Sequence, residues 1–264
     1  MSLVDDMVKA PFAISGERAV ISTGGACNHQ CEYCFVTAGD YRIPAKISTQ
    51  TIIDTVKTFP SSVERIELGL DTDPMLDQPR ALDLISRLGA LGKDVSFATK
   101  ADLTVETVGR LSEIANLMAE QGNFLFTKVS LMGFKTAQAY EPGAPSPERR
   151  VDTIKRLHAA GLPNIVYVKP ILPTLPDKEL ERVFEETQGH VYAYIAGYLI
   201  YDEMMAHKLS IKVSEEQMKM EWDPSQRNWS IYRDPRIEEL IQRENVFKVS
   251  ANAIAHVKNI FKNK

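Results

Sequence analysis

A short apolar strand pattern followed by a helical pattern recurs six times along this chain of 264 residues. Runs rich in Val, Ile, Phe and Tyr predict the strands, and apolar residues at helical spacing predict the helices between them. Strands that alternate with helices in this way favour a parallel sheet of the α/β class. Six units rather than eight fit an open barrel better than a closed one. The predicted strands span residues 19–22, 63–68, 95–99, 124–130, 164–170 and 191–197.

The rest of the chain is expected to add to this barrel rather than to form a second core. Residues 1–197 contain the six units, and residues 198–264 follow them as a C-terminal extension. Within the extension the sequence predicts a strand at 246–250 and a helix at 251–262. A chain of this length commonly forms one domain, so we expect the extension to pack on the barrel and partly close its mouth.

All the cysteines of the chain lie in the segment CNHQCEYCF, as Cys27, Cys31 and Cys34. Three thiolates so close together can ligate three irons of a cubic [4Fe–4S] cluster, which takes four cysteines when the protein ligates every iron. The remaining iron would then have an open coordination position, where chemistry can occur. The loop follows the first predicted strand, and barrels of this kind place their chemistry at that end of the strands.

Other interpretations of these cysteines remain open. A disulfide is disfavoured because the cysteine count is odd, the spacings are short and no signal peptide is visible. A structural zinc site takes four ligands, usually in two separated pairs, and His29 would have to be the fourth. His29 lies between Cys27 and Cys31, where it would have difficulty completing a tetrahedron. The cluster is therefore favoured, with zinc or unligated thiols as the alternative.

The overall composition argues against several classes of protein. The chain is 44% hydrophobic and 25% charged with a formal net charge of −4, which gives no general attraction to nucleic acid or anionic membranes. No apolar run approaches the roughly 20 residues of a membrane span. Nothing at the N-terminus resembles a targeting peptide. We therefore expect a cytoplasmic protein in a reducing setting, which an oxygen-sensitive cluster would need.

The segment CNHQCEYC resembles the signature of the radical S-adenosylmethionine (SAM) enzymes. The resemblance implies a [4Fe–4S] cluster ligated by Cys27, Cys31 and Cys34, with the amino and carboxylate groups of SAM on the open iron. An electron from the cluster would cleave the sulfonium of SAM and yield a 5′-deoxyadenosyl radical, which abstracts hydrogen from a substrate. The fold of that family is a partial (β/α)6 barrel, in agreement with the strand pattern.

The resemblance also implies SAM contacts at the carboxyl ends of the strands. Asp71, Thr72 and Asp73 follow the second strand, where related enzymes bind the amino group of SAM. Carboxylates after a strand also form turns and helix caps, so this structural role stays open. A lysine, a hydroxyl, a carboxylate and an aromatic residue near the same end of the barrel are further candidates, each with an ordinary surface, turn or packing role as the alternative. They are Lys100, Ser130, Glu141 and Tyr33.

Residues 141–173, which include SPERRVDTIKRLHAAG and VKPILP, resemble the corresponding part of spore photoproduct lyase and its relatives. That lyase opens a thymine dimer and uses a further cysteine to return hydrogen, whereas this sequence has no fourth cysteine. Three hypotheses follow. The first is radical modification of a nucleotide or nucleic-acid base. The second is radical modification of a peptide, a protein side chain or a small metabolite, and the third is a metal-binding protein without catalysis.

The expected partners follow from these hypotheses. A radical SAM enzyme needs an external electron donor such as a flavodoxin or a ferredoxin. Contact with nucleic acid is not supported by the net charge, but a set of basic residues offers a local surface for it. An exposed amphipathic helix explains most of that set equally well. The set comprises Lys46, Arg149, Arg150, Lys155 and Arg156.

Overall fold

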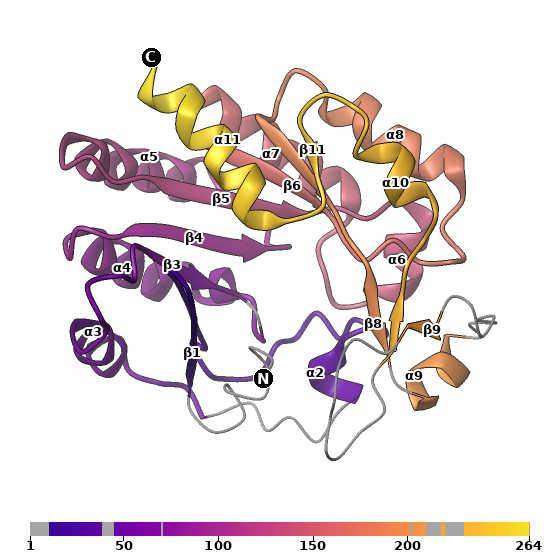
Figure 1. Ribbon diagram of the computed structural model, residues 1–264, viewed down its shortest axis with the longest axis horizontal. Helices are drawn as coiled ribbons and strands as arrows, with labels where there is room; N and C mark the ends of the chain where they lie inside the picture. Colours follow the sequence, from indigo (N-terminus) through magenta and orange to yellow (C-terminus); the bar gives the residue numbers. More distant parts are fainter. Residues whose placement is uncertain are drawn as a thin grey trace.

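The central feature of the structure is an eight-stranded sheet, which can be followed in the ribbon diagram of Figure 1. The computed structural model describes residues 11–38, 45–69, 71–201, 203–209, 218–219 and 230–263. In space the strands follow the order β1-β2-β3-β4-β5-β6-β7-β11, with β1 antiparallel to β2 and the remaining neighbours parallel. Their bounds are β1 Phe12–Ser15, β2 Arg18–Ile21, β3 Arg65–Leu68, β4 Asp94–Thr99, β5 Leu125–Ser130, β6 Asn164–Val168, β7 Ala193–Ala196 and β11 Val246–Phe247.

Strands β2 to β7 are the six strands that the sequence predicts, to within two residues at each end. They form an open, mostly parallel α/β sheet, so the predicted fold class is confirmed. Parallel strands are covered on both faces and therefore read as continuous apolar runs. In β5, accordingly, all six residues are buried, including Lys128 and Ser130.

Helices connect the parallel strands. Three of the longer ones, α3, α5 and α7, are capped by the hydroxyls of Ser48, Thr104 and Ser146, which accept hydrogen bonds from backbone N–H groups in the first turn. None of the helices in the described part of the chain has the length and apolar character to cross a membrane. The helices are α2 Phe35–Ala38, α3 Thr49–Lys57, the 3₁₀ turn η1 Pro74–Asp77, α4 Gln78–Gly89, α5 Val105–Glu120, α6 Lys135–Tyr140, α7 Pro147–Ala159, α8 Asp177–Thr187, α9 Glu203–Lys208, α10 Arg236–Leu240 and α11 Ser250–Lys262.

The two faces of the sheet are covered differently. On the outer face, strand residues such as Ile66, Phe97 and Val129 are buried in one core with the apolar stripes of α4, α5, α7 and α8. On the inner face, Phe126 and Ile165 are buried with residues of α11. Burial of each large apolar side chain contributes roughly 1.5–3 kcal/mol, so these two cores hold the barrel together.

The extension after β7 contributes to the barrel at several points. A second sheet, of order β8-β10-β9, begins shortly after β7 with β8 Leu199–Tyr201 and is completed by β10 Ser230–Tyr232 and β9 Met218–Lys219. Arg236 on α10 donates to the backbone carbonyls of Leu172 and Leu175, which ties the extension to the loop after β6. Strand β11 pairs with β7, and Figure 1 shows α11 (yellow) lying in front of the strands.

The predicted strand at 246–250 is shorter than expected, because α11 already begins at Ser250. The predicted helix at 251–262 corresponds to α11. Its buried residues, Ala253, Ile254 and Val257, pack on the inner face of β5, β6 and β7.

Candidate cluster and cofactor site

The loop that carries the cysteines leaves the carboxyl end of β2 and runs into α2. Cys27 and Cys34 are partly exposed, Cys31 is buried, and all three are free thiols. The backbone N–H of Cys34 donates to the carbonyl of Cys31 at 3.1 Å, which folds the second half of the motif into a tight turn. In the described part of the chain, no three His, Cys, Asp or Glu side chains are grouped so as to hold a single metal ion.

The loop is held on one side by the segment between α6 and α7. The carbonyl of His29 accepts from the N–H of Gly143 at 3.0 Å, and the N–H of Glu32 donates to the carbonyl of Tyr140 at 2.9 Å. The backbones approach so closely that a Cβ on Gly143 would lie 2.0 Å from the carbonyl oxygen of Asn28. Only glycine fits at such a contact.

On its other side the loop is held by Asp73, which follows β3. Asp73 Oδ2 accepts from His29 Nε2 at 2.8 Å, from Thr99 Oγ1 at 2.9 Å and from the Lys100 N–H at 2.7 Å. Its Oδ1 accepts from the Met75 N–H at 2.9 Å and so caps η1. Asp73 therefore joins the cysteine loop to the carboxyl end of β4. Because its oxygens already serve protein donors, a direct contact between Asp73 and SAM stays a prediction.

The ionisation of Asp73 follows from these contacts. Burial works to raise the pKa of Asp73, but the hydrogen bond and charge of His29 and the bonds from Lys100 and Thr99 outweigh it. The pKa of Asp73 consequently lies below its ordinary value, and the group is a carboxylate at neutral pH.

Replacing His29 with alanine is expected to loosen the cysteine loop. The change removes a buried hydrogen bond to a charged group, which typically contributes about 1.5–3 kcal/mol. After anaerobic reconstitution, we expect His29→Ala to lose iron to a chelator several times faster than the unmodified protein. Asn28→Ala, an exposed neighbour in the same loop, is the matched control. Equal rates of iron loss in the two variants would contradict the proposed brace.

Asp71 and Thr72 join the ends of β2 and β3. The Ser22 hydroxyl donates to Asp71 Oδ2, and the hydroxyls of Thr23 and Thr72 lie 3.0 Å apart. Ser22 Oγ also accepts from the Gly24 N–H at 3.1 Å. All these residues are buried, so the predicted pair lies beneath the start of the cysteine loop and fixes its direction.

Among the predicted SAM contacts, Tyr33 and Lys100 meet at a third, the buried carboxylate of Glu141 at the end of α6, and Arg150 links Ser130 to it. Its Oε1 accepts from the Tyr33 hydroxyl and lies 3.9 Å from Lys100 Nζ, and its Oε2 lies 2.6 Å from Arg150 Nη1. Glu141 is 2% exposed and Arg150 is 1% exposed. Arg150 Nη1 also donates to the carbonyl of Ser130 at 3.0 Å. The structure thus brings Tyr33, Lys100, Ser130 and Glu141 together beside the cysteine loop.

Arg150 is a member of this site that the sequence interpretation does not identify as such. The sequence groups it with exposed basic residues, but on α7 it lies on the buried stripe with Val151, Ile154 and Leu157. Its spacing of four and seven residues from the last two is the signal that could have revealed its burial.

The charges around Lys100 favour its protonated form. Burial works to lower the pKa of Lys100, but the Glu141 carboxylate and the Cys31 sulfur outweigh burial and raise it. In Cys31, burial raises the pKa of the thiol to about 11, Lys100 lowers it, and the neighbouring Cys34 and Cys27 add to the rise. The three sulfurs are therefore electrostatically coupled, and binding of iron would supply the positive charge that stabilises their thiolate forms.

In the structure, the residues of the predicted basic surface do not form one exposed basic surface. Arg150 is buried, and Arg149 and Arg156 both pair with Asp102, at 2.5 Å and 2.6 Å. Lys46 lies on another element and pairs with Asp77 at 2.5 Å. The local nucleic-acid surface expected from these residues is therefore largely neutralised or buried.

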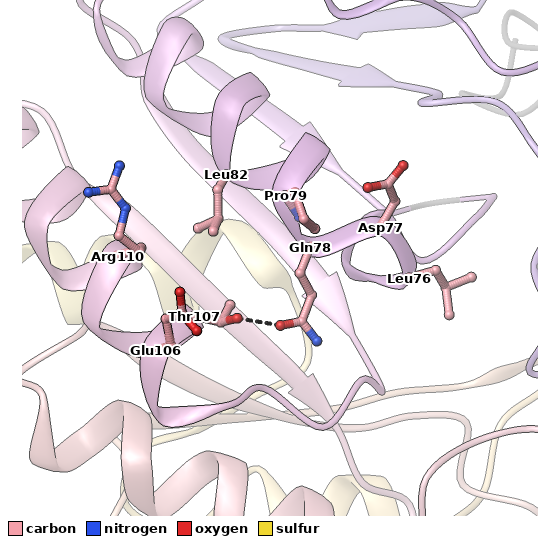
Figure 2. Close-up of a pocket in the computed structure, with 8 residues that line it drawn as sticks. All are labelled: Leu76, Asp77, Gln78, Pro79, Leu82, Glu106, Thr107 and Arg110. Atoms are coloured by element: carbon pink, nitrogen blue, oxygen red, sulfur yellow. Dashed lines mark hydrogen bonds between the residues drawn. The ribbon is translucent and has the colours of Figure 1, made fainter.

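A surface pocket of about 750 Å³ lies between the first turns of α4 and α5, as Figure 2 shows. In that view the side chain of Gln78 accepts a hydrogen bond from the Thr107 hydroxyl across the pocket. Gln78 also donates to the carbonyl of Asp102 at 3.1 Å. None of the predicted site residues lines this pocket, and its polar groups serve to join the two helices.

The structure therefore combines an open parallel α/β sheet with a loop of three cysteines at the carboxyl end of its first parallel strand. The model of the radical SAM superfamily matches residues 21–187, which is more than half of the chain. The chain therefore belongs to the radical SAM superfamily.

The chain is also similar in sequence to two uncharacterized proteins. An uncharacterized protein of Mycobacterium tuberculosis is 28% identical over 171 residues, covering 57% of this chain and 48% of the relative. This chain thus spans about half the length of that mycobacterial relative. An uncharacterized protein of Methanocaldococcus jannaschii is 24% identical over 206 residues, covering 72% of this chain and 73% of the relative.

Solved structures share the fold. Spore photoproduct lyase complexed with dinucleoside spore photoproduct superposes with a TM-score of 0.64 and 14% identity, covering 92% of this chain and 74% of the lyase. SuiB of Streptococcus suis bound to SAM gives a TM-score of 0.55 and 12% identity, covering 78% of this chain and 45% of SuiB.

Membership of the radical SAM superfamily implies a [4Fe–4S] cluster and SAM as cofactors. The residues present fit these groups. Three free, coupled thiols on one loop suit a cluster that leaves one iron for SAM. The protonated Lys100 beside them, and a Ser130 hydroxyl with no hydrogen-bond partner among the described residues, suit the polar groups of SAM.

Proposed function

We propose that Cys27, Cys31 and Cys34 hold the [4Fe–4S] cluster and that the protein modifies a nucleotide or nucleic-acid base through hydrogen abstraction. The chemistry that the cluster and SAM supply when bound is reductive cleavage of the sulfonium and hydrogen abstraction from the substrate. The observation that carries the proposal is the convergence of the cysteine loop with Lys100 and Glu141 at one end of the barrel.

The roles of the chain's own groups follow from their placement. Lys100 offers an ammonium to the SAM carboxylate, and Ser130 offers a hydroxyl to the same ligand. Glu141 pairs with Arg150, lies beside Lys100 and accepts a hydrogen bond from Tyr33 of the cysteine loop. Asp73 holds His29 and the backbone of Lys100, so it maintains the distance between the loop and the cofactor wall.

The substrate class is supported by one neighbour and limited by the cysteine inventory. Spore photoproduct lyase, which shares the fold, binds a dinucleoside photoproduct. All three cysteines of this sequence lie in the cluster motif, so within it no cysteine remains to return a hydrogen atom. We therefore propose a nucleotide-type substrate without a cysteine relay, and a flavodoxin or ferredoxin as the electron donor.

Anaerobic reconstitution tests the proposed chemistry. With SAM and dithionite, the cluster-loaded protein is expected to produce 5′-deoxyadenosine, measured by chromatography. Deuterium carried by a nucleotide substrate is expected to appear in that 5′-deoxyadenosine. Intact SAM under these conditions would reject the enzymatic proposal, whereas cleavage without label transfer from any nucleotide would reject the substrate class alone.

Replacing Lys100 with methionine is expected to weaken SAM binding by about tenfold to a hundredfold. The change removes one charge-assisted hydrogen bond, worth roughly 1.5–3 kcal/mol. Equilibrium binding of SAM to the oxidised cluster protein measures the effect. Lys178→Met, an exposed lysine on α8, is the control. Unchanged SAM affinity in Lys100→Met would remove Lys100 from the proposed cofactor wall.

A further inference from the structure

A cavity of about 900 Å³ lies beside α11 on the inner face of the sheet. The turn between β1 and β2, the beginnings of β2, β3 and β4, and the first turns of α11 form its wall. Of these, β1, β3, β4 and α11 are labelled in Figure 1. Ile195 of β7 and Lys169, just after β6, complete it. None of the cysteines lines it. Its volume suits a small organic ligand of nucleotide size.

The strands around this cavity carry more positive than negative charge. Arg18 and Arg65 are register neighbours on β2 and β3, and like charges on adjacent strands repel. Lys128 is fully buried on β5. The carboxylate of Glu67 serves both Arg18, at 3.1 Å, and Lys128. Burial works to raise the pKa of Glu67, but Lys128 and Arg18 outweigh it and lower it to about 2, so Glu67 is fully ionised.

Lys169 adds a further positive charge at the carboxyl end of β6. Its aliphatic stem packs on Gly197, where a Cβ would come within 2.6 Å of it. The side chain is accessible and lines the cavity, yet burial of its ammonium lowers the pKa of Lys169. Among the described residues, Lys169 forms no hydrogen bond and no ion pair. An anion bound in the cavity would compensate the charge of this exposed lysine.

The other carboxylates at the cavity do not supply that compensation. Glu17 and Glu64 are exposed at its rim, and in the described part of the structure neither pairs with Lys169 or Arg65. Asp94 already pairs with a lysine of α11 and accepts a backbone N–H. The Nε of Arg65 is buried and has no hydrogen-bond partner among these residues. Two cationic donors thus face the cavity unsatisfied.

We propose that this cavity binds the phosphate group of a small phosphorylated substrate, with Lys169 and Arg65 as its main ligands. A phosphate ester carries up to two charges and several acceptor oxygens, which matches an arginine fork and a lysine ammonium. Lys169 follows β6 at the same edge of the sheet as Lys100 and Ser130, whereas Arg65 begins β3 at the opposite edge. That the ligand is the substrate rests on the proposed function, whereas anion binding does not.

Binding titrations of the cluster-loaded protein test the site. Thymidine 5′-monophosphate is the probe, because its base differs from the adenine of SAM. It is expected to bind at one site, to be displaced by inorganic phosphate, and to exceed thymidine in affinity by about tenfold or more. A single-stranded oligothymidylate that binds much more tightly than the mononucleotide would overturn the small substrate in favour of nucleic acid. Absence of binding by phosphate and mononucleotide would overturn the site.

Variants of the two cations distinguish a ligand site from a structural role. Lys169→Met is expected to leave the thermal midpoint of the ligand-free protein nearly unchanged, since the lysine is exposed, and to abolish the rise caused by phosphate. Arg65→Gln is expected to weaken mononucleotide binding by about tenfold. Lys178→Met on α8 is the exposed control and should change neither. Unchanged mononucleotide affinity in Lys169→Met would reject the proposal, whatever the midpoint of the variant.

Different results would reject the proposed function and the proposed phosphate site. SAM cleavage without substrate reports only the cluster and cofactor site, so its persistence in Lys169→Met would leave the proposed function standing. If phosphate binds but SAM is never cleaved, the anion site stands and the proposed function falls.

Discussion

Replacing Cys34 with alanine is expected to abolish cluster retention and SAM cleavage together. Iron and sulfide content should fall to background after anaerobic reconstitution, and 5′-deoxyadenosine should fall below detection. The reason is the small ligand set: with three cysteines in the sequence, no spare thiolate can replace a missing one. Cys34 is preferable to the buried Cys31 for this test, because its side chain is partly exposed and its removal disturbs the core less.

The control for this variant compares its fold with that of the unmodified protein, both without metal. The metal-free forms of Cys34→Ala and of the unmodified protein should have the same far-ultraviolet circular dichroism, since the Cys34 backbone hydrogen bond to Cys31 does not need the sulfur. A Cys34→Ala protein that keeps a full cluster and cleaves SAM would exclude Cys34 as an iron ligand.

Replacing Glu141 with glutamine is expected to give the largest loss of stability of the site variants. It leaves Arg150 buried without its carboxylate, and breaking a buried ion pair in this way costs about 3–5 kcal/mol. Glu141 also accepts from the Tyr33 hydroxyl, so the same change disturbs the cysteine loop. The free energy of unfolding of the metal-free protein, from denaturant titration, measures the effect. It would be a large share of a typical total of about 5–15 kcal/mol.

Two further variants make this prediction specific. Glu148→Gln on the same stretch of chain breaks an exposed pair with Arg182 at 3.8 Å and should cost at most about 1 kcal/mol. The double variant Glu141→Gln with Arg150→Met should cost less than the sum of the single changes, because no charge is left unpaired. A cost below about 1 kcal/mol for Glu141→Gln alone would mean that the buried pair does not contribute as described.

The parts of the fold that sequence patterns predict are the strongly periodic ones. Strands β2 to β7 and helices such as α5 carry apolar runs or stripes, so the sequence alone indicates which segments are strands and which are helices. The short strands β1 and β9 are not among the predicted strands, and β11 is shorter than the strand expected at 246–250. The register that places Arg18 beside Arg65 depends on which strands become neighbours, and no local pattern contains that information.

The candidate site divides in the same way. The cysteine loop is predictable because its ligands are close in sequence, whereas His29 and Asp73 are separated by 44 positions and meet only in the folded chain. The position of Asp73 after a strand predicts that it belongs to the site. Its four hydrogen-bond donors could not be predicted, because they come from the cysteine loop, from β4 and the residue after it, and from η1. Arg150 escapes sequence reasoning because a charged side chain in an amphipathic helix is ordinarily exposed.

The placement of β11 and α11 has a consequence for how the chain is made. Until residues 246–262 have been synthesised, β7 presents an open edge and the apolar groups around Phe126 and Ile165 lack their cover. Exposed strand edges and bare apolar surface are the usual starting points of aggregation. The nascent barrel therefore passes through a vulnerable stage after its six parallel strands have emerged, and this stage ends only when α11 has been added.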